Sequence, residues 1–253
     1  MNLEGKVAVV TGATRGLGKD IGHALTGRGA LVAAVARSAE RFRCDVSKPD
    51  QVELVKDQIE AELGRPQILV NAAGIFGPVD PITRSDPLGW CETIMIDLVG
   101  PYLMSRALVA GMIDAGWGRI VNVTSAASLH PPGPLGSAYA TAKAGLNQLT
   151  RHLAADLEGT GVTANVIHPG DVKTDMWADI REQAAALGTE GEALRQWVDW
   201  VEETGGDPPH KAVDLVQRVL DEEVNGRFLW IEDPLQPPIA SWGEDGGLQP
   251  WRR

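Results

Sequence analysis

Lys6-Val-Ala-Val-Val-Thr-Gly-Ala-Thr-Arg-Gly-Leu-Gly18 is the segment that decides the fold. It begins with an apolar run typical of a buried parallel strand, and apolar residues at helical spacing follow from Ile21 to Leu25. Glycines between a strand and a helix let the backbone approach a pyrophosphate, and the helix N-terminus presents free N–H groups to it. The spacing of Gly12, Gly16 and Gly18 is not the GxGxxG fingerprint. The prediction of a dinucleotide site therefore rests on the order strand, glycine turn and helix.

Downstream of this segment, short apolar runs alternate with helical patterns, which predicts one α/β domain over residues 1–253 with a doubly wound, mostly parallel sheet. Apolar runs predict strands at 6–11, 30–36, 67–70, 119–125, 162–167 and 226–231. Helical spacing predicts helices at 49–63, 90–115, 139–157 and 210–224. Gly100-Pro101 should bend or interrupt the helix over 90–115.

Residues 175–209 break the alternation and predict a helical lid over a bound substrate, with helical segments at 176–187 and 192–203. The lid carries Met176, Trp177, Trp197 and Trp200. These side chains either line an apolar pocket or pack against the main domain or a neighbouring subunit. A tail over 232–253, rich in proline, glycine and tryptophan, is expected to dock on another surface.

Composition narrows the class of protein. A chain of 253 residues with 43% hydrophobic residues suits one domain with a sizeable core and argues against wholesale disorder. A formal net charge of -11 argues against nucleic acid as the main partner. The two cysteines show no zinc spacing, the N-terminus lacks signal-peptide regions, and no apolar run approaches transmembrane length. We expect a cytoplasmic protein that contacts no membrane, and the scattered histidines predict no metal.

Arg37, at the end of the second predicted strand, bears on the choice of cofactor. An acidic residue near this point binds the 2′-hydroxyl of NAD, whereas an arginine accommodates the 2′-phosphate of NADP. Arg15 in the glycine turn offers a second cation, and Arg41 and Arg43 are further candidates. The residues predict NADP(H), unless both Arg15 and Arg37 are ordinary solvated side chains. The connection to Asp45 is too short for a crossover helix and predicts one helical turn at 39–42.

Tyr139 and Lys143 are the candidate chemical groups. Four residues apart on a helix, they lie on one face, and the ammonium should favour the phenolate and lower the tyrosine pKa. Such a phenol can exchange a proton with a carbonyl or alcohol oxygen. Ser125, at the end of the preceding strand, could hydrogen-bond the same oxygen. His130 lies in the loop between them and is expected to be exposed rather than part of a pocket.

Taken together, these motifs resemble the short-chain dehydrogenase/reductase family in its compact single-domain branch. The similarity covers about Lys6 to Thr174 and the final strand, with the motifs in family order. These are Thr11-Gly-x-x-x-Gly-x-Gly18, Asn71-Ala-Ala-Gly74, Ser125, Tyr139-x-x-x-Lys143 and Asn165-Val-Ile-His-Pro-Gly170 with Val172 and Thr174. The resemblance implies a Rossmann fold and carbonyl–alcohol interconversion by hydride transfer.

The resemblance also implies a role for each matching residue. Tyr139 would be the general acid in reduction and the base in oxidation, Lys143 would bind the nicotinamide ribose and lower the tyrosine pKa, and Ser125 would polarise the substrate carbonyl. The remaining matches would hold the cofactor. They are Gly12, Thr14, Arg15, Gly16, Leu17 and Gly18 at the pyrophosphate, Arg37, Asp45 and Val46 at the adenosine, Asn71, Ala72, Ala73 and Gly74 at the middle, and Pro169, Gly170, Val172 and Thr174 at the nicotinamide.

Three departures from the family pattern accompany these matches. Asp97 takes the place of an asparagine that supports a water relay to the lysine, and as an added catalytic candidate it should favour the charged form of Lys143. The connection from Arg37 to Asp45 is shorter than usual. The end of the chain lacks the glycine-rich finish, which could alter the dimer or tetramer that the resemblance implies.

The sequence therefore predicts an NADP(H)-dependent oxidoreductase acting on a small or medium carbonyl or secondary alcohol. NAD(H) preference is the alternative within the same family. A non-catalytic nucleotide-binding protein is the alternative from another class, and Asp97 and the unusual tail are its support.

Overall fold

The computed structural model describes residues 2–129 and 135–231. His130 and the tail predicted over 232–253 lie outside the described residues. Seven strands form one sheet in the order β3-β2-β1-β4-β5-β6-β7, and each neighbouring pair is parallel. This confirms the predicted doubly wound fold. The strands are β1 Val7–Thr11, β2 Leu31–Ala36, β3 Phe42–Arg43, β4 Pro66–Asn71, β5 Gly118–Val123, β6 Val162–His168 and β7 Phe228–Trp230.

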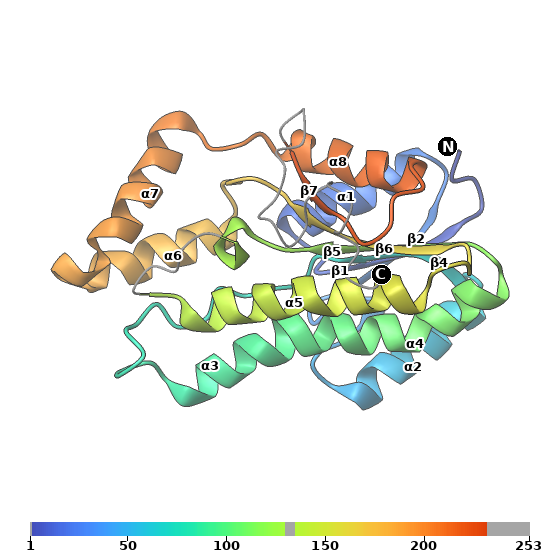
Figure 1. The fold of residues 1–253 in the computed structure, drawn as a ribbon, viewed down its shortest axis with the longest axis horizontal. Coiled ribbons are helices and arrows are strands. Elements are labelled where there is room, and N and C mark those ends of the chain that lie inside the picture. Colours follow the sequence, from blue (N-terminus) through green and yellow to red (C-terminus); the bar gives the residue numbers. More distant parts are fainter. Residues whose placement is uncertain (1, 130–134, 232–253) are drawn as a thin grey trace.

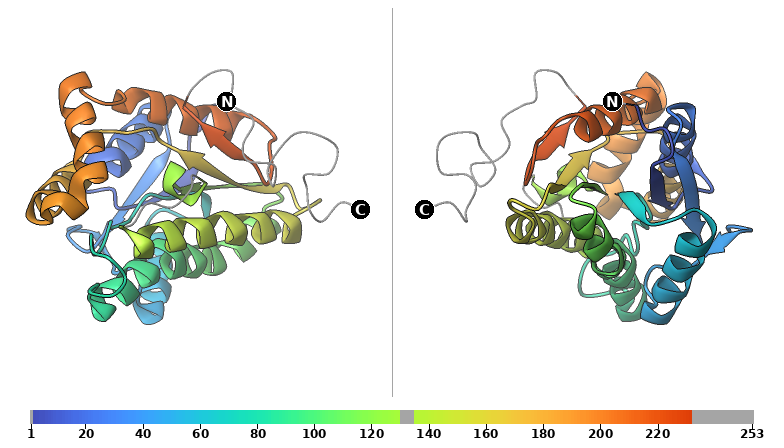
Figure 2. Two further views of the ribbon diagram at one scale, coloured as in Figure 1. Left: turned by 60° about the vertical axis from the view of Figure 1, so that its left-hand side comes forward. Right: turned by 90° about the vertical axis from the view of Figure 1, so that its right-hand side faces the viewer.

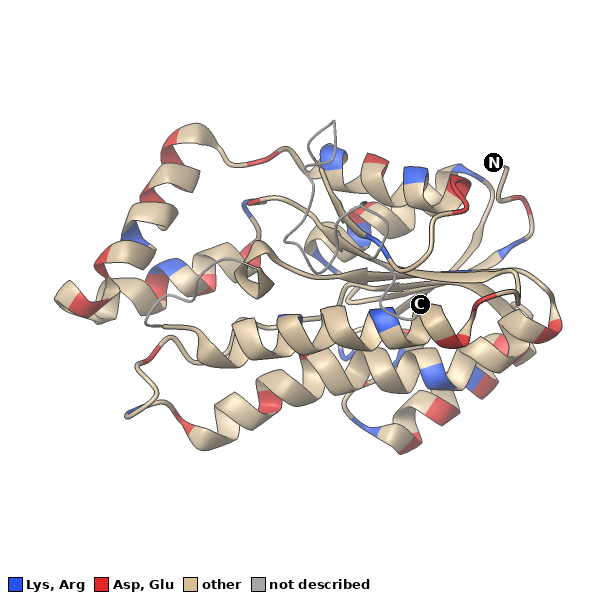
Figure 3. Cartoon of the chain, viewed as in Figure 1, with Lys and Arg blue, Asp and Glu red and all other residues tan. Residues whose placement is uncertain are grey.

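Helices cover both faces of this sheet (Figures 1 and 2). Helices α1 and α8 lie side by side on one face, and α2, α4 and α5 cover the other. Their bounds are α1 Gly16–Gly27, α2 Pro49–Glu62, α3 Pro87–Ile94, α4 Gly100–Asp114, α5 Ser137–Asp156 and α8 Pro209–Asp221. Lys and Arg residues are interspersed with Asp and Glu along these helices (Figure 3).

Two apolar cores explain why the short runs form buried strands. Alternate β1 residues point to opposite faces of the sheet, so Val9 packs toward α2 and α4, and Val10 packs toward α1 and α8. Both side chains are fully buried. Each buried side chain of this size contributes about 1.5–3 kcal/mol. The strands are therefore held on both faces, and their carboxyl ends form one rigid edge.

The helix predicted over 90–115 is interrupted, as Gly100-Pro101 suggested. A π-helical segment, η1 Met95–Val99, separates α3 from α4. Pro101 has no N–H for the helical ladder, and π-helical turns are frequent at functional sites. This segment places Asp97 in the interior of the protein.

One expectation about apolar runs needs correction. Pro87–Asp114 is long and apolar enough, by length and composition alone, to cross a membrane. Core helices of soluble proteins pass the same test, and Leu103, Met104 and Met112 of this stretch are buried in the core against the sheet. Packing within the domain thus accounts for part of the apolar character of this stretch, in which an apolar window of 18 residues is 44% buried.

The short connection after β2 contains no crossover helix, as predicted, but it contains no helical turn at 39–42 either. The chain turns after Ala36 and forms β3, whose Phe42 pairs with Val35. The free edge of β2 offers backbone hydrogen-bond partners that a single helical turn would leave unused. Phe42 is buried in the core on the α2 side, which fixes this edge strand.

The predicted lid is helical and projects beyond the carboxyl ends of the strands, at the left of Figure 1. It consists of α6 Asp175–Ala186, η3 Gly188–Gly191 and α7 Glu192–Thr204. Trp177, Ile180, Val198 and Val201 form its own small core. An isolated bridge between Val172 and Gly206 ties the start of the lid to its end.

Candidate active site

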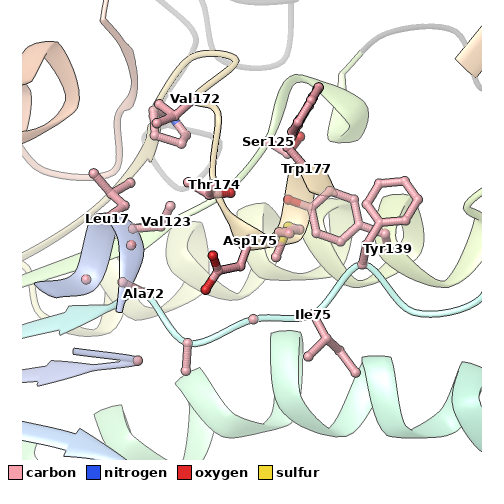
Figure 4. Close-up of a pocket in the computed structure, with 18 of the residues that line it drawn as sticks. Leu17, Ala72, Ile75, Val123, Ser125, Tyr139, Val172, Thr174, Asp175 and Trp177 are labelled. Atoms are coloured by element: carbon pink, nitrogen blue, oxygen red, sulfur yellow. The ribbon is translucent and has the colours of Figure 1, made fainter. Parts of the chain in front are cut away.

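A cavity of about 970 Å³ opens where the carboxyl ends of the strands meet the lid (Figure 4). The glycine turn, the end of β2, the segment after β4, the start of α5, the loop after β6 and the lid all line it. Brought together in this lining are Gly12, Thr14, Arg15, Gly16, Leu17, Gly18, Arg37, Asp45, Val46, Ala72, Ala73, Gly74, Ser125, Tyr139, Lys143, Pro169, Gly170, Val172 and Thr174.

Two predicted residues lie outside this lining. Asn71 is buried in the sheet, where its side-chain amide donates a hydrogen bond to Asn122 at 2.8 Å. Asp97 lies behind Lys143 and is fully buried. Both can act on the cavity only through neighbouring groups.

Two glycines of the glycine turn, Gly12 and Gly18, are packed too closely to tolerate a side chain. A Cβ on Gly12 (φ 69°) would lie 2.8 Å from the Cα of Ala73, and one on Gly18 would lie 2.6 Å from the carbonyl oxygen of Gly12. The hydroxyl of Thr11 accepts hydrogen bonds from the N–H groups of Ala72 and Ala73, each at 3.1 Å. These contacts fix the turn against the segment after β4.

The lining fits the diphosphate of a dinucleotide. No side chain caps the N-terminus of α1, and Gly16, Leu17 and Gly18 of its first turn line the cavity. Free N–H groups and the positive end of the helix dipole favour an anion there. In contrast, no group of three His, Cys, Asp or Glu side chains that could hold a metal ion occurs in residues 2–129 and 135–231.

Arg15 and Arg37 both line the cavity and are mostly exposed. Arg15 pairs with Asp175 at the start of the lid at 3.3 Å, and Arg37 approaches Glu92 at 3.8 Å. Exposed ion pairs of this kind are worth about 0–1 kcal/mol. Both guanidinium groups are therefore free energetically to exchange these partners for a phosphate. Arg41 and Arg43, the other cations considered, are not in the lining.

Tyr139 and Lys143 lie on successive turns of α5, with the Lys143 Nζ 5.4 Å from the centre of the Tyr139 ring. Ser125 follows β5, and its hydroxyl acts on Tyr139 to lower the pKa of the phenol. Ser125 and Tyr139 both border the cavity in Figure 4. Phe76 packs on the other side of the tyrosine, with ring centres 4.8 Å apart. A substrate oxygen beside Ser125 and Tyr139 would meet two hydroxyl groups.

The Lys143 side chain is held in place by two acceptor groups. Its Nζ donates a hydrogen bond to the carbonyl oxygen of Val123 at 3.0 Å and lies 3.1 Å from the Oδ2 of Asp97. The Oδ1 of Asp97 accepts a hydrogen bond from the N–H of Ile75 at 2.9 Å. Burial alone would lower the pKa of Lys143, but the Asp97 carboxylate raises it above its ordinary value. Lys143 therefore stays charged at neutral pH.

The expected lowering of the Tyr139 pKa is only part of what the structure shows. Burial raises the pKa of Tyr139, and Asp97 adds to this effect. Lys143 and the hydrogen bond to Ser125 act in the predicted, opposite direction, but the pKa remains above its ordinary value. The phenol is therefore protonated at neutral pH in the ligand-free protein.

A buried hydrogen-bond chain holds the turn that carries Ser125. Asn147, one turn beyond Lys143 on α5, accepts a hydrogen bond from the Thr124 hydroxyl at 2.6 Å and donates one to the Ser128 hydroxyl at 2.8 Å. Ser128 in turn donates to the carbonyl oxygen of Ser125. Asn147 thus fixes the serine turn relative to the helix that carries the tyrosine and the lysine.

Asn147→Leu should lower turnover by about tenfold or more, because a small misplacement of a reacting group is costly. We expect a fall in kcat with unchanged dinucleotide affinity, measured by steady-state kinetics and direct titration. The control is Asn2→Leu, the same substitution at an exposed position near the start of the chain. It should leave both kcat and dinucleotide affinity unchanged. Unaltered kcat in a folded Asn147→Leu protein would contradict this role.

Sequence reasoning did not identify Asn147. It also did not identify several apolar residues that line the cavity. Phe76, Leu135, Ile180, Leu194 and Trp230 come from five different segments. Helical spacing marks Asn147 as sharing a face with Tyr139 and Lys143, so that signal was available. The others carry no local motif, because only the tertiary arrangement brings them together.

Comparison with known proteins gives a consistent result. The family model for short chain dehydrogenases matches residues 6–185. A short chain dehydrogenase of Pseudocercospora fijiensis is 31% identical over 97% of this chain and 86% of its own. The 3-oxoacyl-acyl-carrier-protein reductase FabG of Pseudomonas aeruginosa is 36% identical over 74% of this chain and 83% of its own.

A solved structure supports the same fold. The ligand-free aldohexose dehydrogenase of Thermoplasma acidophilum superposes with a TM-score of 0.77 and 26% identity, covering 93% of this chain and 98% of that one.

Proposed function

The chain belongs to the short-chain dehydrogenase family, and from that premise we propose that it interconverts a ketone and a secondary alcohol with NADP(H), using Tyr139 as general acid and base. The observation that carries the proposal is the single cavity that Ser125, Tyr139 and Lys143 share with the glycine turn. The reductase relative is named for a 3-oxoacyl group and the structural neighbour for an aldohexose. Between them, the two names cover both directions of such a reaction.

The cofactor, when bound, supplies or accepts the hydride. The chain's own residues then handle the substrate oxygen. In reduction, Ser125 donates a hydrogen bond to the carbonyl oxygen, and the Tyr139 phenol gives its proton to that oxygen as negative charge develops. The charged Lys143 stabilises the resulting phenolate electrostatically. In oxidation, the phenolate removes the alcohol proton.

Cofactor preference tests the roles of Arg15 and Arg37. NADPH should bind the protein more tightly than NADH, because only its 2′-phosphate meets these guanidinium groups. Arg37→Asp should reverse the preference, with about a tenfold or greater loss of NADPH affinity. Tryptophan fluorescence can report both titrations, since Trp177, Trp197 and Trp230 line the cavity.

Arg41→Asp is the matched control, because it makes the same change of charge at an exposed site outside the lining. It should leave the ratio of NADPH to NADH affinity unchanged. Equal effects of the two substitutions would show a general charge effect, and tighter binding of NADH to the unmodified protein would favour an NAD(H) dehydrogenase.

The raised pKa of Tyr139 predicts opposite pH profiles for the two directions. Reduction needs the protonated phenol, so kcat/KM should be flat through neutral pH and fall only as alkaline pH deprotonates Tyr139. Oxidation needs the phenolate, so its kcat/KM should rise from neutral to alkaline pH. Initial rates in both directions across pH 6–10.5 would measure this. An oxidation rate that falls with rising pH would contradict the assignment of Tyr139 as base.

We also propose that the protein works in the cytoplasm as a homo-oligomer, a dimer or a tetramer, built on the helices that carry Asp97 and Tyr139. Met95, Tyr102 and Ile113 are exposed apolar side chains on η1 and α4, which suits a helix-to-helix interface. Light scattering after gel filtration would test this, and a monomer at micromolar concentration would exclude it.

A further inference from the structure

The cavity has two chemically different halves. Around the glycine turn and the end of β2, its lining carries glycines, backbone groups and the two arginines. Beyond Tyr139, apolar and aromatic side chains dominate. This half, which we term the lid compartment, is lined by Phe76, Leu135, Met176, Trp177, Ile180, Ala193, Leu194, Trp197 and Trp230.

The aromatic side chains are held in place rather than free to move away. Trp177 is 4% exposed and packs with Ile180, Val198 and Val201 in the core of the lid. Phe76 packs both on the Tyr139 ring and against that core. Trp230 meets the His168 ring edge-on, with centres 4.7 Å apart. The compartment is therefore a preformed apolar surface around the reacting hydroxyl groups.

The lid itself is fastened to the loop opposite. Gln183 of α6 accepts a hydrogen bond from the N–H of Val79 at 3.3 Å. Glu190 of η3 makes a two-pronged ion pair with Arg84. Both contacts join the lid to the segment between β4 and α3, so they keep the compartment walled on two sides.

The charged residues of the lining also restrict the class of substrate. Arg15, Arg37 and Lys143 are its cations within the part of the chain that the structure describes. The two arginines belong to the cofactor half, and Lys143 is paired with Asp97. Near the lid the lining carries the carboxylates Asp171, Asp175 and Glu190. Arg84 pairs with Glu190, and Arg15 pairs with Asp175. An anionic substrate would lose its hydration there without gaining a cation, which is costly.

We propose, on the basis of the proposed function, that the substrate is a neutral ketone or secondary alcohol carrying a bulky, ring-bearing apolar group. The ring would lie in the lid compartment against Phe76, Trp177 and Trp197, with the reacting oxygen at Ser125 and Tyr139. Polyhydroxylated substrates fit poorly, since these apolar walls leave their hydroxyl groups without partners. Substrates with a carboxylate or phosphate near the ring are disfavoured by the missing cation.

The test compares three ketones on the intact protein with both cofactors: 4-phenyl-2-butanone, its para-carboxylate and the polar ketose erythrulose. Isothermal titration calorimetry on the cofactor-loaded protein measures binding, and cofactor absorbance measures turnover. 4-Phenyl-2-butanone should bind about tenfold or more tightly than either rival, with the same order in kcat/KM. Equal or tighter binding of the carboxylate or of erythrulose, or no binding of 4-phenyl-2-butanone, would overturn the proposal.

Binding and turnover separate this proposal from the function on which it rests. If the phenyl ketone binds in the expected order but neither cofactor supports turnover of any ketone, the proposed reaction fails and the compartment's selectivity stands. If turnover occurs but favours the charged or polar ketone, the reaction stands and the substrate class fails.

A variant that introduces a charge into the lid compartment provides a sharper test of where the ring lies. Leu194→Arg places a cation in the lining and should improve kcat/KM for the para-carboxylate at least several-fold while lowering it for 4-phenyl-2-butanone. Gln196→Arg adds the same charge at an exposed position of α7 outside the lining and should change neither. Identical responses of the two variants would overturn the placement of the ring.

Discussion

Tyr139→Phe should reduce turnover by about 10²–10⁴-fold, the range that a positioned general acid or base contributes, while leaving cofactor affinity close to that of the unmodified protein. The substitution removes only the hydroxyl group. The ring remains and can keep its contact with Phe76, 4.8 Å between centres. Lys143 also keeps its bonds to Val123 and Asp97, so the site should retain its shape.

The chain offers an ideal control for this experiment, since Tyr102 is its other tyrosine. Tyr102 lies on α4, is 47% exposed and is not in the cavity lining. Tyr102→Phe makes the identical chemical change and should leave kcat, KM and cofactor titrations unchanged. If Tyr139→Phe kept more than about a tenth of the turnover, another group would have to move the proton.

The sequence was sufficient for the elements that local physics determines. The run Val162–Ile167 predicted β6 because a short, mostly apolar run of strand length suits a strand buried on both sides. The glycine turn was predictable for a similar reason, since Gly12 and Gly18 stand where a Cβ would collide with backbone. Helical spacing alone predicted that Tyr139 and Lys143 share a face, whereas their catalytic roles were predicted from the other motifs and the family resemblance.

What the sequence could not supply depends on contacts between distant segments. β3 is only two residues long, and its pairing requires the free edge of β2, so no periodicity reveals it. The pKa of Tyr139 is set by burial under side chains from several segments, whereas the sequence showed only the neighbouring Lys143. From the sequence, the lid tryptophans could either line an apolar pocket or pack against the main domain or a neighbouring subunit. The structure places Trp177 in both the lid core and the cavity lining.

The position of Asp97 is the clearest case. Its departure from the family pattern was visible in the sequence, and the expected effect on Lys143 agrees with the raised pKa of that lysine. Its partners were not visible. They lie 22 and 46 residues away along the chain, at Ile75 and Lys143, and the π-helical segment η1 brings the carboxylate to both.

Those two partners explain why an aspartate and not an asparagine suits this position. Both are donors, one the N–H of Ile75 and the other the ammonium of Lys143, and a carboxylate has an acceptor oxygen for each. An asparagine has one acceptor, so its NH₂ group would face one of the donors. Gly74 leaves little room for rearrangement, because a Cβ there would already lie 2.9 Å from the Asp97 Oδ2.

Asp97→Ala should therefore lower the free energy of unfolding by about 3–5 kcal/mol, the usual cost of removing one partner of a buried ion pair. Asp97→Asn should cost about 1–3 kcal/mol, the cost of an unsatisfied buried donor. Urea unfolding of the purified variants measures both. Asp114→Asn, which breaks an exposed pair with Arg65 at 3.5 Å, is the control and should change stability by less than about 0.5 kcal/mol.

These losses would not mean that the ion pair is worth that much. Burial raises the pKa of Asp97 despite the attraction of Lys143, so desolvation offsets much of the attraction. The cost of a single substitution arises because the remaining charge is buried alone. The double variant Asp97→Asn with Lys143→Met should accordingly be more stable than Asp97→Ala, although it lacks the lysine to which we assign a role in turnover. A double variant less stable than either single one would show that the pair is itself strongly stabilising. Recovery of stability in the double variant would show that the charge left unpaired, rather than the loss of the ion pair itself, causes the cost of the single substitution.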